Sequence, residues 1–128
     1  MSVEPTFFDL SPLTAVSPID GRYARHTEDL REICSEFGLI KYRVTIEVRW
    51  LLHLAMQPDV AELPPFDAPS IAALNDLIDG FSLADAERIK AIEKNTNHDV
   101  KAVEYWLQER CSALGKLEAA IPFLHFAC

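Results

Sequence analysis

The sequence has none of the features that mark membrane proteins or disulfide-bonded secreted domains. Its longest apolar runs fall far short of the roughly 20 residues that a membrane-spanning helix needs, and no basic segment leads into an apolar one near the N-terminus. We therefore expect a cytoplasmic protein without membrane association. The only cysteines are Cys34, Cys111 and Cys128, and their odd number and wide spacing indicate neither a disulfide framework nor a zinc site.

Short motifs that carry catalysis are also absent. The sequence contains no glycine-rich phosphate loop, no HExxH motif and no cluster of cysteine and histidine. Three of the histidines, His26, His53 and His125, have no acidic or metal-binding neighbour at a useful spacing, so we interpret them as ordinary surface or core residues. No metal and no cofactor is expected.

Basic residues are scarce as well. There are 12 Lys and Arg residues against 20 Asp and Glu residues, which gives a net charge of −8. This balance argues against broad nucleic-acid binding, but it leaves room for a few arginines that hold a small phosphate. The chain has 128 residues and is 49% hydrophobic, as is typical of one globular domain with a real core.

Apolar residues at spacings of three and four predict an all-α fold of five or six helices, and no stretch alternates as a strand would. We expect a short helix over 26–34 and a long helix over 36–56 that forms the spine of the domain. Arg43 and Glu47 lie four apart on the long helix and are expected to pair across its surface. One continuous apolar stripe is predicted from Ile33, Phe37, Ile40, Val44, Val48, Leu51 and Ala55.

Three further helices follow a proline-rich loop over 58–69. One begins near Ser70 and ends near Gly80, with Ile71, Leu74 and Ile78 on one face. The next begins after a capping box formed by Ser82 and Asp85. The last helix carries an apolar stripe and is interrupted at Gly115; the stripe consists of Val100, Val103, Leu107, Cys111 and Leu114.

The predicted division of the chain is an extended arm over 1–16, a helical domain over 17–114 and a final segment over 115–128. The final segment ends in an apolar stretch, Phe123 to Cys128, with nothing polar after it. Chain ends are usually exposed and polar. We therefore expect the natural chain to continue beyond this point.

The first candidate site is the start of the last helix, where Asn97, His98 and Asp99 stand side by side. Thr96 and Asp99 have the spacing of a capping box, which predicts a helix start near Asn97. A helix N-terminus presents unpaired N–H groups and the positive end of the helix dipole, so anions bind there readily. The alternative interpretation is that these residues only cap the helix.

The second candidate site is a turn over 17–23. Pro18 disfavours helix at the preceding residue, and Gly21 permits a turn that other residues resist. Such a turn presents Arg22 and Tyr23 outward from a fixed backbone. The alternative is a plain loop with one solvated arginine.

These two sites lie within longer segments that resemble a known family. The chain is similar to the N-terminal part of the bacterial adenylosuccinate lyases, which belong to the fumarase and aspartase superfamily. The likeness covers nearly the whole chain from Leu13 onward. It rests on residues 13–23, on 35–39 leading into 47–51, on 96–105 and on 125–128.

The resemblance implies a fold and an activity. The fold is the N-terminal helical domain of this superfamily without its central bundle of long helices. Members of the family eliminate fumarate from adenylosuccinate, which gives AMP, and from the succinylated carboxamide ribotide earlier in purine biosynthesis. They act as homotetramers. The substrate-binding residues that the resemblance implies are Arg22, Tyr23, Asn97, His98 and Asp99.

The roles of these residues stay open at the level of sequence. Arg22 suits a phosphate by its charge and fork geometry, and Tyr23 either donates one hydrogen bond or packs beside the ligand. His98 either donates to the phosphate or positions the leaving group, and Asp99 either orients His98 or caps the helix. The resemblance places the general-acid histidine and general-base serine beyond this chain, so no catalytic residue is predicted in it and the chain alone is expected to be inactive.

Two alternatives remain. One keeps the superfamily but changes the substrate to argininosuccinate or an aspartate derivative; the Gly21-Arg22-Tyr23 segment, which suits a nucleotide phosphate, weighs against it. The other is a non-enzymatic helical interaction module, which composition alone favours.

Overall fold

The structure of the chain, a computed structural model, describes residues 9–127 and contains helices but no strand within that range. The predicted all-α fold is therefore confirmed. Residues 1–8 of the predicted arm, and Cys128, lie outside the described residues. The α-helices are α1 (Arg31–Cys34), α2 (Glu36–Leu54), α3 (Ala68–Asp79), α4 (Leu83–Thr96) and α5 (Asp99–Ala113), and the short 3-10 helices are η1 (Ala24–His26), η2 (Glu28–Leu30) and η3 (Glu118–Phe123).

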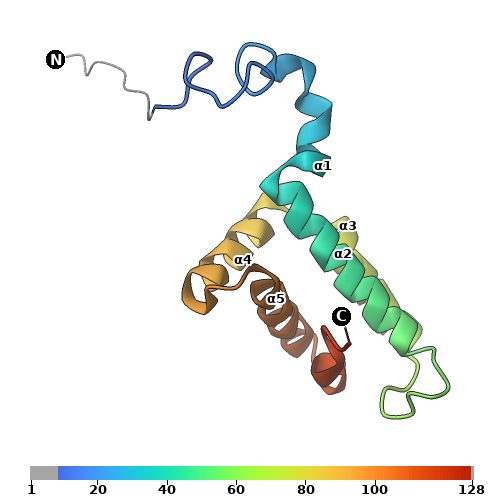
Figure 1. Cartoon of the computed structure of the whole chain (residues 1–128). Helices are drawn as coiled ribbons and strands as arrows, with labels where there is room; N and C mark the ends of the chain where they lie inside the picture. Colours follow the sequence, from blue (N-terminus) through green and yellow to red (C-terminus); the bar gives the residue numbers. More distant parts are fainter. Residues whose placement is uncertain (1–8, 128) are drawn as a thin grey trace.

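Helix α2 is the spine of the bundle, as predicted (Figure 1). Ser35 caps it by accepting a hydrogen bond from the Gly38 N–H at 3.2 Å. Val44, Val48 and Leu51 are fully buried, so the predicted stripe forms the core face of α2. Ile33 is an exception and is 53% exposed. It belongs to α1, and the extended backbone of Ser35 between the two helices takes it off the stripe.

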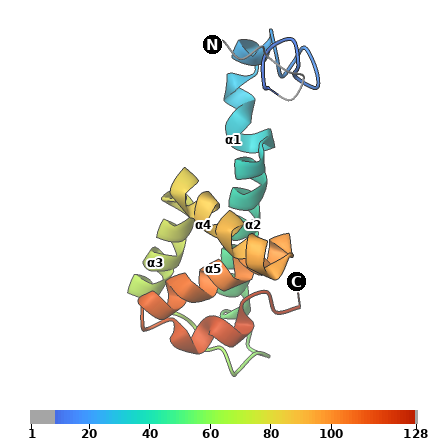
Figure 2. The same ribbon diagram turned by 90° about the vertical axis from the view of Figure 1, so that its left-hand side faces the viewer.

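Helix α3 runs alongside α2, while α4 and α5 pack against each other and both contact α2 (Figures 1 and 2). The predicted capping box at the start of α4 is confirmed: Ser82 and Asp85 bond each other's backbone N–H groups. On α3, Leu74 and Ile78 are buried, but Ile71 is 40% exposed, so its predicted place on the buried face is wrong.

The end of the chain completes the core. Helix α5 ends before Gly115, whose φ of 63° turns the chain back. Leu117, Ala120 and Leu124 are then buried, and η3 packs on α5. Leu114, which was predicted on the buried stripe, is 41% exposed because it follows the last helical residue.

The segment before α2 projects beyond the bundle (Figures 1 and 2). The predicted helix over 26–34 is only partly correct, because η1 and η2 precede a single turn of α1. Thr27 interrupts the helix with a φ of −119° and a ψ of 12°. Neither α1 nor the 3-10 turns contain a buried residue. Across the described range, no helix combines the length and apolar character that crossing a membrane requires.

Candidate functional site

The junction between α4 and α5 contains three of the five predicted site residues, Asn97, His98 and Asp99. Asn97 ends α4 in the left-handed conformation, with a φ of 54°, and its N–H donates to the Glu93 carbonyl at 2.7 Å. Asparagine tolerates this conformation better than most residues do. The chain therefore turns sharply here and starts α5 two residues later, at Asp99.

His98 caps α5 with its side chain. Its Nδ1 accepts a hydrogen bond from the Lys101 N–H at 3.1 Å. The predicted capping box of Thr96 and Asp99 is therefore wrong: Thr96 is the last residue of α4, and its hydroxyl contacts the backbone of Glu93 and His98. The physical reason is that α4 runs through Thr96 and is ended by the left-handed Asn97, so the N-cap of α5 is His98.

The capping bond also sets the chemistry of the His98 ring. Because Nδ1 accepts a hydrogen bond, it carries no proton, and the neutral ring carries its proton on Nε2. The side chain is 63% exposed, so this N–H can reach a ligand. The positive end of α5 lies beside it. His98 is therefore a hydrogen-bond donor suited to an anionic group.

Asp99 is held by two groups. Its Oδ1 accepts from the Val100 N–H at 2.8 Å, and its Oδ2 pairs with Arg43 of α2 at 2.8 Å. These contacts lower the pKa of Asp99, the Val100 N–H contributing most. The His98 Nδ1 lies 3.9 Å from Oδ1 of Asp99, which is too far for a hydrogen bond between the two side chains to orient the imidazole.

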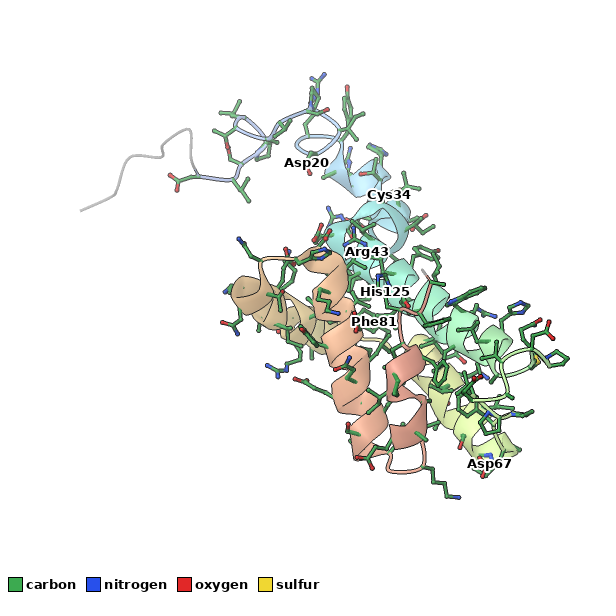
Figure 3. All side chains as sticks on the ribbon, turned by 60° about the horizontal axis from the view of Figure 1, so that its bottom comes forward. Asp20, Cys34, Arg43, Asp67, Phe81 and His125 are labelled. Atoms are coloured by element: carbon green, nitrogen blue, oxygen red, sulfur yellow. The ribbon has the colours of Figure 1, made fainter. Side chains whose placement is uncertain are left out.

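The predicted pair of Arg43 and Glu47 is wrong, since each residue has a partner from a distant part of the chain. Arg43 pairs with Asp99, and Glu47 contacts Nδ1 of His125 at 2.6 Å. The interpretation of His125 as a histidine without an acidic partner is also wrong. In Figure 3, Arg43 belongs to α2, and His125, which follows η3, lies against that helix. The fold thus brings His125 onto α2 one helical turn from the Arg43–Asp99 pair.

A signal for the Glu47 contact was present in the sequence. Glu47 directly precedes Val48 of the apolar stripe and is only 6% exposed. Carboxylates are almost never buried unless they are paired. A glutamate on the edge of a core face therefore indicates a partner, although the sequence does not say which one.

Arg22 and Tyr23 lie on the projecting segment, away from the α4–α5 junction (Figures 1 and 2). The Tyr23 N–H donates to the Pro18 carbonyl at 2.9 Å, which closes the predicted turn. The guanidinium of Arg22 stacks 4.6 Å from the Tyr23 ring, and both residues are exposed. No hydrogen bond or ion pair in the described part of the chain joins this pair to Asn97, His98 or Asp99.

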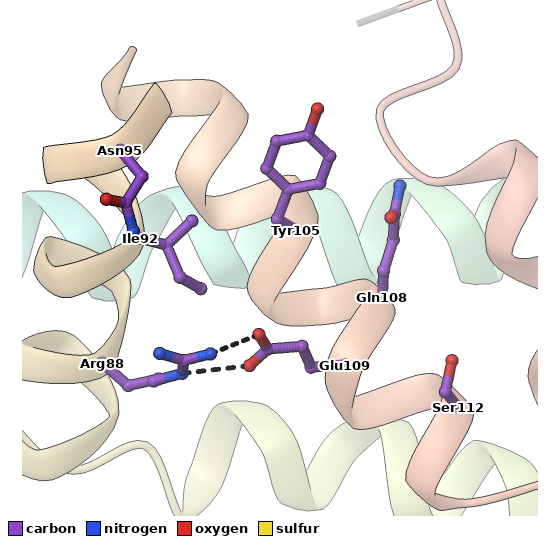
Figure 4. A pocket seen from close by; sticks show the side chains of 7 residues that line it. All are labelled: Arg88, Ile92, Asn95, Tyr105, Gln108, Glu109 and Ser112. Atoms are coloured by element: carbon purple, nitrogen blue, oxygen red, sulfur yellow. Dashed lines mark hydrogen bonds and ion pairs between the residues drawn. The ribbon is translucent and has the colours of Figure 1, made fainter. Parts of the chain in front are cut away.

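The structure contains an open surface groove of about 560 Å³ between α4 and α5, but it is separate from these residues (Figure 4). Arg88 and Glu109 form a two-pronged ion pair across it. None of the five predicted site residues lines this groove, which consists of Arg88, Ile92, Asn95, Tyr105, Gln108, Glu109 and Ser112. The groove and the predicted site residues are therefore separate features of the described surface.

Comparison with known proteins supplies the context for this arrangement. The chain is 54% identical over 120 residues to an adenylosuccinate lyase of Vibrio cholerae, and 52% identical over 120 residues to one of Escherichia coli K12. It is 53% identical over 119 residues to one of Haemophilus influenzae. The chain is homologous to part of the adenylosuccinate lyases. The resemblance predicted from the sequence, to an N-terminal part of this family, is thus confirmed.

The extent of the match matters for function. The adenylosuccinate lyase of Vibrio cholerae matches 94% of this chain, yet the chain spans only 26% of that relative's length. The same shares hold for the Escherichia coli relative. No protein-family model matches the chain. The chain therefore corresponds to about a quarter of an adenylosuccinate lyase.

Proposed function

We propose that this chain is the N-terminal part of a lyase that eliminates fumarate from adenylosuccinate, giving AMP, and from the succinylated carboxamide ribotide of purine nucleotide biosynthesis. The observation that carries the proposal is the match of 94% of the chain to adenylosuccinate lyases at 52–54% identity. The parent enzyme is proposed to be a cytoplasmic homotetramer.

The arrangement of the α4–α5 junction supports a substrate-binding role. The elimination requires a base for a weakly acidic proton, an acid for the departing nitrogen, and donors for the developing negative charge and the phosphate. His98 offers an exposed Nε2–H beside the N-terminus of α5. Asp99 is engaged by Arg43 and fixes this junction to α2, while Asn97 shapes the turn.

The projecting turn supplies the second part of the proposed site. Arg22 carries the cationic fork that suits a phosphate, and Tyr23 lies against it. The distance of this turn from the α4–α5 junction means that the two groups serve different ends of a ligand or different active sites of the oligomer. The acid and base of the reaction are proposed to come from the rest of the parent enzyme, so the 128-residue chain alone is inactive.

A chimeric enzyme tests this proposal. The matched 120 residues of the Vibrio cholerae adenylosuccinate lyase are replaced by those of this chain, and fumarate release from adenylosuccinate is measured. We expect the chimera to turn over and the isolated chain to show no activity. A folded chimera without activity, or an isolated chain with turnover near that of the complete enzyme, would contradict the proposal.

Single variants of the chimera test the site. Loss of a charge-assisted hydrogen bond costs about 1.5–3 kcal/mol, so R22A is expected to lower kcat/KM by roughly tenfold to a hundredfold. The matched control is R25A, an exposed arginine three positions along in η1 whose Nε contacts His26. Equal losses in both variants would assign the effect to the folding of the segment and not to a substrate contact.

A further inference from the structure

Glu47 is a buried carboxylate with few hydrogen-bond partners among the described residues. It lies among the core residues of α2, between Val44 and Val48, and is 6% exposed. Its Oε1 contacts the imidazole of His125 at 2.6 Å, while its Oε2 has no hydrogen-bond partner among the described residues. The desolvation of this carboxylate is therefore compensated chiefly through one contact, the one to His125.

The segment that carries His125 is held to α2 twice. Besides the Glu47 contact, the indole Nε1 of Trp50 donates to the Phe126 carbonyl at 2.7 Å. The backbone of His125 is left-handed, with a φ of 60°, which a histidine adopts only when its surroundings fix it. The contacts of His125 with Glu47 and of Phe126 with Trp50 hold the His125 backbone in this conformation.

The Glu47 contact selects the state of the imidazole. An ionised carboxylate only accepts hydrogen bonds, so against ionised Glu47 the ring donates from Nδ1. When the ring is neutral, its proton is therefore on Nδ1, and Nε2 is a free acceptor. The His125 side chain is 32% exposed, so the ring is only partly covered by the fold. His125 thus has the opposite tautomer to His98, whose proton is on Nε2.

Helix α2 also fixes where His125 lies. Arg43 and Glu47 are one helical turn apart, about 6 Å along the axis. Arg43 pairs with Asp99 and Glu47 contacts His125, and residues four apart lie on the same face of a helix. One helix therefore sets the position of the α4–α5 junction and of residues 125–126 relative to each other.

We propose that Glu47 is a positioning residue: its carboxylate fixes the tautomer and orientation of His125 on α2, one helical turn from the Arg43–Asp99 pair. The expected effect of Glu47 on catalysis rests on the proposed function. The contact between Glu47 and His125 is a property of this chain and does not depend on that function. Glu47 does not touch the substrate and acts through His125.

Nitrogen NMR of the histidine rings in the 128-residue chain tests the structural content. At a pH where the rings are neutral, we expect wild-type His125 to show a protonated Nδ1 and an unprotonated Nε2. In E47L, which keeps the buried volume and removes the acceptor, the two nitrogens should average between tautomers. In E47Q, whose amide oxygen still accepts, the wild-type pattern should return. The Trp50 indole N–H signal reports whether the segment remains docked.

A matched control is E104L, which removes a second glutamate that is buried among the described residues and contacts Lys101 and Gln108 on α5. It should leave the His125 pattern unchanged. A proton on Nε2 of His125 in the wild-type chain would overturn the inference, and this measurement does not depend on the folding of any variant. A docked E47L with the wild-type pattern would overturn it as well.

The chimeric lyase tests the catalytic consequence. E47L is expected to lower kcat at least tenfold with a smaller change in KM, and E47Q to restore most of the activity. If the chimera is inactive with either residue while the NMR pattern is as expected, the proposed function fails and the positioning of His125 stands. If the chimera is active and E47L behaves as wild type, the positioning role fails and the proposed function stands.

Discussion

Replacement of Gly38 by alanine separates what helix propensity predicts from what the packing of α1 on α2 predicts. Gly38 is buried in the first turn of α2. In a helix, alanine is favoured over glycine by about 1 kcal/mol. However, a Cβ at this position would lie 2.3 Å from the Ile33 carbonyl oxygen and 2.5 Å from its carbon. Propensity therefore predicts a gain in stability, and packing predicts a loss.

The structure indicates the size of the net effect. Ordinary Cβ contacts begin at 3.4 Å, so the end of α1 must move by about 1 Å. Overpacking of this kind costs about 1–3 kcal/mol. After the propensity gain of about 1 kcal/mol, we expect a net loss of about 0–2 kcal/mol in the free energy of unfolding. Because α1 has no buried residue, the chain relieves the clash by displacing α1.

Urea unfolding followed by circular dichroism gives the stability change, and amide NMR signals of Ile33 and Cys34 report the movement of α1. The control is G115A. No atom lies within 4 Å of a Cβ there, but the φ of 63° imposes a cost of about 1 kcal/mol without moving α1. A G38A protein that is more stable by about 1 kcal/mol, with unchanged Ile33 and Cys34 signals, would refute the packing argument.

Three further predictions follow from the core and its titrating groups. L51A, which truncates a fully buried side chain of α2, is expected to cost about 2–5 kcal/mol in urea unfolding. The pKa of Asp99 is lowered, chiefly by the Val100 N–H, so ionised Asp99 stabilises the fold fully above its unfolded-state pKa and less as the pH falls. D99N should therefore flatten the acid side of a plot of unfolding free energy against pH. An unchanged plot would contradict this. Burial raises the pKa of Cys111 to about 11. Alkylation near pH 8 should therefore modify the exposed Cys34 and spare Cys111 until the protein unfolds. Equal labelling of Cys34 and Cys111 in the folded chain would show that Cys111 is accessible.

Local patterns were sufficient for the elements that depend on nearest neighbours. The stripe of α2 and the capping box of Ser82 and Asp85 were both predicted correctly, because periodicity and caps act over three or four residues. The capping box of Thr96 was wrong for a similarly local reason. Helix α4 continues through Thr96 and is ended by the left-handed Asn97, so Thr96 belongs to a helix end and not to a helix start.

Contacts between distant segments were outside the reach of these patterns. Arg43 and Glu47 have the spacing of a surface pair, and nothing nearby in the sequence shows that Asp99 and His125 compete for them. A side chain pairs with whatever the fold brings closest, and a residue 78 positions away is as available as one four positions away once the chain has folded. Whether the two candidate sites, residues 97–99 and residues 22–23, meet in space was likewise outside the reach of local patterns.

The sequence by itself determined the helical class, the spine helix and the homology to adenylosuccinate lyases. The helices follow from the periodic spacing of apolar residues, and the homology follows from contiguous segments that match. Only the tertiary structure decided which nitrogen of His98 carries the proton, which carboxylate holds His125, and how far Arg22 lies from the α4–α5 junction. Each of these depends on partners that the fold brings together from separate helices, and hydrogen bonds and ion pairs act only over the few ångströms that folding creates.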